Sequence, residues 1–388
     1  MKKKLLFIID SLTCGGAEKS LVSLLHLLNR DKYDISLWLL SPKGDFLPLV
    51  PEHIYLITQP QYSTIEKIKL RLAHILFSMA IRHKRVLKLK EHGAETLWKC
   101  AGWAYKVPEG EWDVVFAYQQ GFPTYLVAEK FTAPKKFAWV NADIFAAGYN
   151  IKFNTKFYRK FTNIVPVSGI LKDLMSEKMP ELKDVYSVVY DIQNPNIIRE
   201  LSMEQIPALR TDAKECILVT VGRLVPPKGY DIAIKAASVL KSRGIKFKWY
   251  FVGEGPERIN IEKKRKEFGV EEEVVLLGLQ INPYAYMGQA DIYVQTSKFE
   301  GFGLTIGEAK ILGKPIVSTN FDVVYNQLTH EKNGLIADMN GESVAENILR
   351  LIEDGELKER IILTLKKEEN TTYHSEVVKV EQLIDYED

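Results

Sequence analysis

Short apolar runs recur along the chain and alternate with segments whose apolar residues return at helical spacing. In the first half the runs are residues 4–10, 35–40, 113–118, 136–140, 164–167 and 186–190. In the second half they are residues 216–221, 247–252, 274–277, 291–295, 315–318 and 334–337. Such runs predict buried strands, and strands that alternate with helices form parallel sheets with right-handed crossovers. The pattern therefore predicts an α/β protein with two doubly wound, Rossmann-like domains.

A break in this rhythm predicts the domain boundary. Residues 191–212 form a mixed polar stretch that contains Pro195 and Pro207, and we expect the linker there. We assign residues 1–195 to the first domain, residues 196–370 to the second, and residues 371–388 to a C-terminal helix that packs back on the first. Ligands of such sheets bind at the carboxyl ends of the strands, so we expect the functional site in a cleft between the domains.

Composition and charge exclude several classes of protein. The 388 residues include 52 Lys and Arg against 50 Asp and Glu, and this balance argues against a dedicated nucleic-acid binder. Cys14, Cys100 and Cys216 are far apart and form neither a metal motif nor a disulfide framework. The first apolar run ends at Asp10, too early for a secretion signal, and no run could span a membrane. We expect a cytoplasmic protein that binds no nucleic acid.

Two glycines follow the first predicted strand, in the sequence Gly15-Gly16-Ala17-Glu18. Glycines allow close approach of a ligand, and the start of a helix offers amide groups to an anion. An ordinary tight turn would look the same. The motif is neither a Gly-x-Gly-x-x-Gly fingerprint nor a P-loop, which weakens the dehydrogenase and NTPase interpretations.

A basic loop follows the strand at residues 216–221. Gly222 and Arg223 come directly after the strand, and Lys228 precedes the next predicted helix. A guanidinium and an ammonium group at this edge of a parallel sheet are suited to a diphosphate. Taken singly, each is also explained as a solvated surface side chain.

Two carboxylates flank a glycine-rich turn after the strand at residues 291–295. Glu300 lies in the loop, and Glu308 lies one turn into the following predicted helix. The pair suits two separate hydroxyl-bearing parts of one ligand, and the amides between them suit its anionic part. An acidic loop before an amphipathic helix is the plain alternative.

These elements together resemble the family-4 retaining glycosyltransferases. The resemblance rests on Glu300…Glu308 (Glu-x7-Glu), Gly222-Arg223-Leu224…Lys228-Gly229, Phe251-Val252-Gly253-Glu254-Gly255-Pro256 and Gly15-Gly16-Ala17-Glu18, in that family's order. It covers nearly the whole chain. It implies a GT-B fold and transfer of a sugar from a nucleotide-diphosphate donor with retained anomeric configuration.

The resemblance also implies roles for individual residues. Arg223 and Lys228 would hold the donor diphosphate, Glu308 the ribose hydroxyls, and Glu300 the donor sugar. The implied catalytic residues are Glu300, Arg223, Lys228 and Asp143. The implied donor-binding residues are Gly15, Gly16, Gly222, Gly253, Leu277, Phe302, Gly303, Leu304, Thr305 and Glu308.

No cofactor or metal is expected besides the nucleotide-sugar substrate. The sequence contains no Asp-x-Asp pair, the usual holder of a divalent ion on a nucleotide-sugar. Arg223 and Lys228 would then neutralise the charge that develops on the leaving diphosphate. We therefore expect metal-independent transfer.

The acceptor side departs from the family pattern at one position. Asn141 stands where members often carry a His, and Asp143 follows two residues later. Asn can donate a hydrogen bond to a hydroxyl or phosphate but cannot relay a proton. Asp143 is the candidate acceptor-side base, and the substitution leaves room for a weak or inactive relative.

Residues 65–90 predict a basic amphipathic helix. This segment contains a single acid, Glu66, and many bases: Lys67, Lys69, Arg71, Arg82, Lys84, Arg85, Lys88 and Lys90. Its apolar residues recur at helical spacing: Ile65, Ile68, Leu72, Ile75, Leu76 and Met79. Such a helix is typical of an element at an anionic membrane surface. The alternative is an ordinary helix with its apolar side on the core.

Together these features predict a hexosyltransferase that uses a nucleotide-sugar, a UDP-hexose, and a lipid-linked saccharide acceptor. Capsule, exopolysaccharide or another surface glycan is the expected product. We expect the enzyme at the inner face of the plasma membrane. A non-catalytic, glycosyltransferase-like partner subunit is the alternative that Asn141 keeps open, and a nucleotide-sugar epimerase is a further one.

Overall fold

The computed structural model describes residues 1–13, 15–87, 91–368 and 372–386. The chain divides into two compact units. The first unit is Met1–Ile192 with Ser375–Asp388, and the second unit is Gln193–His374. The division falls three residues before the expected position 195. Cys14, Lys88 and Lys90 lie outside the described residues.

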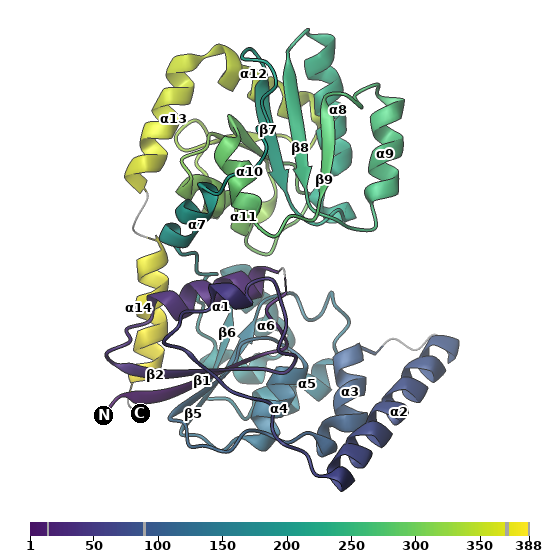
Figure 1. Cartoon of the computed structure of the whole chain (residues 1–388), viewed down its shortest axis with the longest axis vertical. Coiled ribbons are helices and arrows are strands. Elements are labelled where there is room, and N and C mark those ends of the chain that lie inside the picture. Colours follow the sequence, from purple (N-terminus) through teal and green to yellow (C-terminus); the bar gives the residue numbers. More distant parts are fainter. Residues whose placement is uncertain (14, 88–90, 369–371, 387–388) are drawn as a thin grey trace. The chain divides into compact units, whose positions relative to one another are not determined.

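The first unit is built on a six-stranded parallel sheet in the order β3-β2-β1-β4-β5-β6 (Figure 1). Its strands are β1 (Lys3–Ile9), β2 (Tyr33–Leu39), β3 (Tyr55–Leu56), β4 (Val114–Ala117), β5 (Lys135–Val140) and β6 (Asn163–Pro166). Its helices are α1 (Gly16–Leu27), α2 (Thr64–Leu87), α3 (Gly93–Ala101), α4 (Phe122–Lys130), α5 (Ile151–Tyr158), α6 (Gly169–Lys178) and α14 (Thr372–Asp385).

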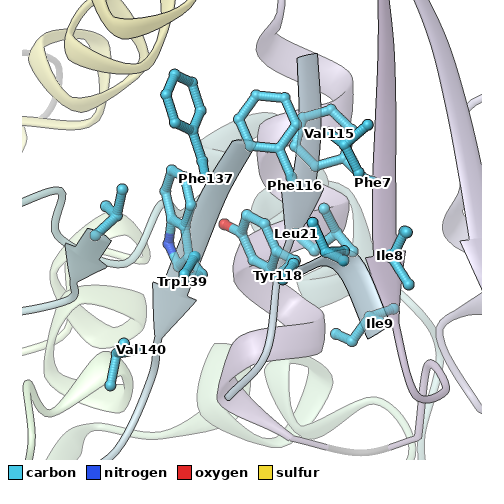
Figure 2. Packing of buried hydrophobic residues seen from close by; sticks show 14 of the residues in the cluster. Phe7, Ile8, Ile9, Leu21, Val115, Phe116, Tyr118, Phe137, Trp139 and Val140 are labelled. Carbon is cyan, nitrogen blue, oxygen red and sulfur yellow. The ribbon is translucent and has the colours of Figure 1, made fainter. Parts of the chain in front are cut away.

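Aromatic side chains from neighbouring strands fill the core of the first unit (Figure 2). The ring centroids of Phe7 and Phe116 are 4.2 Å apart, and those of Tyr118 and Trp139 are 4.8 Å apart. All four side chains are buried, as expected of strands covered on both faces. The C-terminal helix α14 adds Val380 to the same core.

The second unit contains another six-stranded parallel sheet, in the order β12-β11-β10-β7-β8-β9. Its strands are β7 (Cys216–Val221), β8 (Phe247–Val252), β9 (Val274–Gly278), β10 (Ile292–Gln295), β11 (Ile316–Thr319) and β12 (Leu335–Ala337). Its helices are α7 (Pro195–Ser202), α8 (Tyr230–Ser242), α9 (Arg258–Glu267), α10 (Pro283–Gln289), α11 (Leu304–Ile311), α12 (Gly341–Glu353) and α13 (Gly355–Glu368).

Both faces of this second sheet are covered by apolar clusters. In β7, Leu218 packs into one cluster, whereas Ile217 and Val219 pack into the other. This alternation follows from the two-residue repeat of a strand and explains why the run is apolar throughout. The two doubly wound sheets confirm the predicted fold class.

Two expectations from the sequence are wrong. Residues 186–190 form no strand, and only Tyr186 makes a single bridge, to Ile164. The stretch expected as a linker is largely part of the second unit, because it contains α7 and buries Ile198 and Leu209 in that unit's core. The Tyr250 hydroxyl donates to the Leu209 carbonyl at 2.6 Å, which fixes the segment after α7.

Helix α2 carries an apolar stripe on its exposed side. Its members are exposed by half or more: Ile65, Ile68, Leu72, Ile75, Leu76, Met79, Val86 and Leu87. Ala73 is the buried residue of this helix, and α2 packs against α3 (Figure 1). The interpretation that places the apolar side of this helix on the core is therefore wrong. Among the described helices, none has the length and apolar character needed to cross a membrane.

Candidate active site

Two of the glycines predicted to bind the donor, Gly222 and Gly253, lie together at the carboxyl ends of β7 and β8. The Gly222 amide donates to Val252 O at 3.0 Å, and the Gly253 amide donates to Gly278 O at 2.8 Å. Gly253 has a φ of +148°, and a Cβ atom on it would lie 2.0 Å from the Gly222 carbonyl oxygen. Any side chain at Gly253 would therefore clash with the loop after β7.

The loop after β7 is fastened to the loop after β10. The Thr296 hydroxyl donates to Lys228 O at 3.1 Å. Gly229 has a φ of +63°, and a Cβ atom on it would lie 2.0 Å from Thr296 O. This backbone approach, which only glycine permits, places Lys228 beside the loop that carries Glu300.

Glu300 is the centre of a cluster of hydrogen bonds. Its Oε1 accepts from Lys228 Nζ, Gln295 Nε2 and Ser297 Oγ, each at 2.6 Å. The side chains of Lys228 and Glu300 are 22% and 10% exposed, so this ion pair is partly shielded from water. Two of the predicted catalytic residues are thus in direct contact.

Arg223 follows Gly222 and is exposed. Within the described part of the chain, its guanidinium makes no ion pair or hydrogen bond, so it remains available to an anion. Leu277, predicted near the nucleobase, is half-buried in β9. Its carbonyl accepts from Gln280 Nε2 at 2.9 Å.

The turn between the two glutamates leads directly into α11. Gly303 caps the helix with a φ of +84°, and Leu304 is its first residue. Gln327 Nε2 donates to the carbonyl oxygens of Phe302 and Gly303, which holds the turn in place. The first amides of a helix have no acceptor within the helix, so this turn presents donors suited to an anion.

Glu308 is 1% exposed, and its Oε1 accepts from the Tyr284 hydroxyl at 3.0 Å. Its predicted role, the binding of ribose hydroxyls, stays a prediction. Thr305 is also predicted to bind the donor, but its hydroxyl donates to Gln295 Oε1 at 3.1 Å. The Thr305 hydroxyl therefore helps to hold the Gln295 side chain in place.

The acceptor-side residues lie at the carboxyl end of β5, in the first unit. Asn141 Nδ2 donates to Tyr118 O at 2.9 Å, so this side chain ties β5 to β4. Asp143 Oδ1 accepts from the amides of Phe145 and Ala146, at 2.8 and 3.0 Å. One oxygen of Asp143 thus caps a turn, and its role as a base stays a prediction.

Gly15 and Gly16 begin α1, as the sequence predicts. A Cβ atom on Gly15 would lie 2.2 Å from Glu18 Oε2, so the Glu18 carboxylate rests against the start of its own helix. Burial raises the pKa of Glu18, and the hydrogen bond to its own amide opposes this rise. Donor binding by Gly15 and Gly16 stays a prediction.

Four polar side chains that support the site escaped the sequence analysis: Gln295, Ser297, Tyr284 and Gln327. Gln295 carried the one usable signal, since it ends an otherwise apolar strand at the edge where ligands bind. The described residues contain no group of three or more His, Cys, Asp or Glu side chains that could hold a metal ion.

Residues 202–368 match the family model "Glycosyl transferases group 1". The second unit is a group 1 glycosyltransferase domain. This match spans Gly222, Lys228, Glu300 and Glu308, the residues that carry the resemblance seen in the sequence. The two sheets of the chain are those of the GT-B fold.

Similar proteins extend the comparison beyond the group 1 domain. An N-acetylgalactosaminyltransferase of Campylobacter jejuni, named for its N-acetylgalactosamine-N,N'-diacetylbacillosaminyl-diphospho-undecaprenol acceptor, is 26% identical over 92% of each chain. Anabaena HepE, solved with UDP and glucose, aligns with a TM-score of 0.70 at 18% identity over 98% of each chain. WaaG, a glycosyltransferase involved in lipopolysaccharide biosynthesis, aligns with a TM-score of 0.60 at 15% identity over 99% of this chain and 100% of its own.

Proposed function

We propose that the protein is a retaining glycosyltransferase that moves a hexose from a UDP-sugar to a lipid-linked saccharide in the synthesis of capsule, exopolysaccharide or another surface glycan. The observation that carries this proposal is the grouping of Lys228, Glu300 and Arg223 at the carboxyl edge of a parallel sheet in a group 1 domain. The UDP bound to HepE and the diphospho-undecaprenol acceptor of the Campylobacter enzyme favour UDP and a lipid diphosphate.

The charges of these residues suit departure of a nucleoside diphosphate. When the bond between the anomeric carbon and the phosphate oxygen breaks, its electron pair stays on the diphosphate. Lys228 and Arg223 supply cations there, and the start of α11 supplies amide donors. In the structure the Lys228 ammonium group forms an ion pair with Glu300. When the donor binds, this ammonium group would pair with the diphosphate instead.

Retention of the anomeric configuration is assigned to a same-face route. The acceptor hydroxyl bonds to the anomeric carbon on the face that the diphosphate leaves, and its proton passes to the leaving phosphate oxygen. Glu300, whose Oε1 accepts from three donors, is assigned to the donor sugar hydroxyls and not to nucleophilic attack. Glu308, paired with Tyr284, is assigned to the ribose.

Transfer is expected to be independent of divalent metal, since Arg223 and Lys228 take the place of the ion as counter-charge. Initial rates of UDP release should stay within twofold of the control after dialysis against EDTA. Complete loss of activity that magnesium restores would contradict this assignment.

Helix α2 is proposed to bind an anionic membrane surface. Its exposed apolar stripe is bordered by the exposed basic side chains of Lys69, Arg71 and Arg82. Exposed apolar surface of this extent is unusual on a protein, and the basic border matches the negative charge of acidic lipid. Glu66 in α2 also pairs with Lys106, whose ammonium lies 2.8 Å away, which adds to the packing of α2 against α3. Such an element would bring the enzyme to a lipid-linked acceptor at the inner face of the membrane.

A further inference from the structure

Gln295 is a buried amide for which the proposed transfer assigns no role. It is the last residue of β10 and is 1% exposed. The preceding strand residues Ile292, Tyr293 and Val294 are also buried. Burial of a polar side chain has a cost unless each of its groups finds a partner, so the partners of Gln295 indicate what it does.

Two hydroxyl groups fix the orientation of this amide. Tyr293 OH donates to Gln295 Oε1 at 2.5 Å, and Thr305 Oγ1 donates to the same oxygen at 3.1 Å. Burial raises the pKa of Tyr293 well above its usual value, so its hydroxyl stays protonated and acts as a donor. With its oxygen occupied by two donors, the amide must turn its NH2 group the other way.

Both hydrogens of that NH2 group are used at the site. One is donated to Glu300 Oε1 at 2.6 Å and the other to Ser297 Oγ at 2.7 Å. Ser297, also buried, in turn donates its hydroxyl hydrogen to Glu300 Oε1. The donors and acceptors of Gln295 and Ser297 thus have mutually consistent roles around Glu300 Oε1.

We propose that Gln295 is a positioning residue that orients the Glu300 carboxylate for the donor sugar. This inference rests on the role proposed for Glu300. Lys228 alone cannot hold the carboxylate during the reaction, because the diphosphate takes up its ammonium group. Gln295, at the end of β10, and Ser297, buried just after it, are neutral donors, so they would keep Oε1 fixed while Oε2 meets the sugar. Among the described residues, no hydrogen bond is made to Oε2.

The test is a double-mutant cycle between Gln295→Leu and Glu300→Gln, read as kcat and as KM for the donor. We expect Gln295→Leu to lower kcat about 10- to 100-fold with KM within threefold, the usual scale for a misplaced catalytic group. In the Glu300→Gln background, Gln295→Leu should lower kcat by less than a further threefold, because Gln295 acts through Glu300.

A second variant separates positioning from stability. Gln295→Leu leaves the buried Tyr293 hydroxyl without its acceptor, whereas Tyr293→Phe/Gln295→Leu removes both partners and should regain thermal stability. We expect its kcat to remain low. A wild-type kcat in the double variant, or effects of Gln295→Leu and Glu300→Gln that multiply independently, would overturn the positioning role. Full activity of Glu300→Gln would instead overturn the proposed role of Glu300.

Discussion

Replacement of Lys228 by methionine is expected to lower turnover about 10²- to 10³-fold, the usual effect of losing one preorganised group that stabilises developing charge. Methionine keeps much of the length of the side chain but removes the cation that would neutralise the leaving diphosphate. The fold should survive, because Glu300 keeps Gln295 and Ser297 as donors. Initial rates of nucleoside diphosphate release measure the effect.

Lys298, in the loop that carries Glu300, offers a matched control. Its ammonium lies 2.9 Å from Asp231 and its side chain is 43% exposed, so Lys298→Met removes the same charge away from Glu300. We expect this variant to keep at least half of the wild-type rate. Equal losses in the two variants, or a Lys228→Met enzyme with more than half of the wild-type rate, would contradict the assignment of Lys228 to the diphosphate.

Removal of the basic border of α2 is expected to weaken binding to anionic vesicles about 100-fold. Each basic side chain near an acidic lipid surface contributes about 1 kcal/mol, so Lys69→Gln/Arg71→Gln/Arg82→Gln loses about 3 kcal/mol. Co-sedimentation with phosphatidylcholine vesicles, with and without phosphatidylglycerol, measures the change. Equal binding of the wild type to both kinds of vesicle would count against an electrostatic contribution.

Two further variants show which surface is responsible. Lys263→Gln/Lys264→Gln/Lys266→Gln in α9 makes the same change in net charge on a helix without an exposed apolar stripe, and it should bind like wild type. A second triple variant in α2 has polar residues in place of Ile68, Leu72 and Ile75. It should bind vesicles more weakly, because less apolar surface is buried in the membrane. If that variant instead abolishes a dimer in solution, the stripe is an interface between two copies of the chain.

Most strands of both sheets were predictable because parallel strands buried on two faces are short apolar runs. Strand β3 was missed, although it lies within the apolar run Ile54-Tyr55-Leu56-Ile57; only Tyr55 and Leu56, both exposed, pair as a strand there. Residues 186–190 are apolar enough for a strand, yet only Tyr186 bridges to the sheet. Hydrophobicity alone does not distinguish a paired strand from a buried extended segment.

Some residues of the site were likewise predictable from the sequence, and others were not. Glu300, Glu308 and Lys228 were found by the order and spacing of motifs in the chain. Gln295 was missed because its function depends on Thr305 and Tyr293 holding its amide in one orientation, which no spacing encodes. The apolar positions of α2 were predicted correctly, but only the packed structure shows that they face away from the core.

Donor binding across a panel of nucleotide-sugars tests the central claim most directly. Wild type, Lys228→Met and Glu308→Ala would be compared by thermal shift and by release of nucleoside diphosphate. The account predicts that one nucleotide-sugar, a UDP-hexose, raises the melting temperature of the wild type and slowly releases its diphosphate, while neither variant responds. If no nucleotide-sugar shifts the melting temperature of the wild type, the donor site is wrong and a non-catalytic partner subunit becomes the better account.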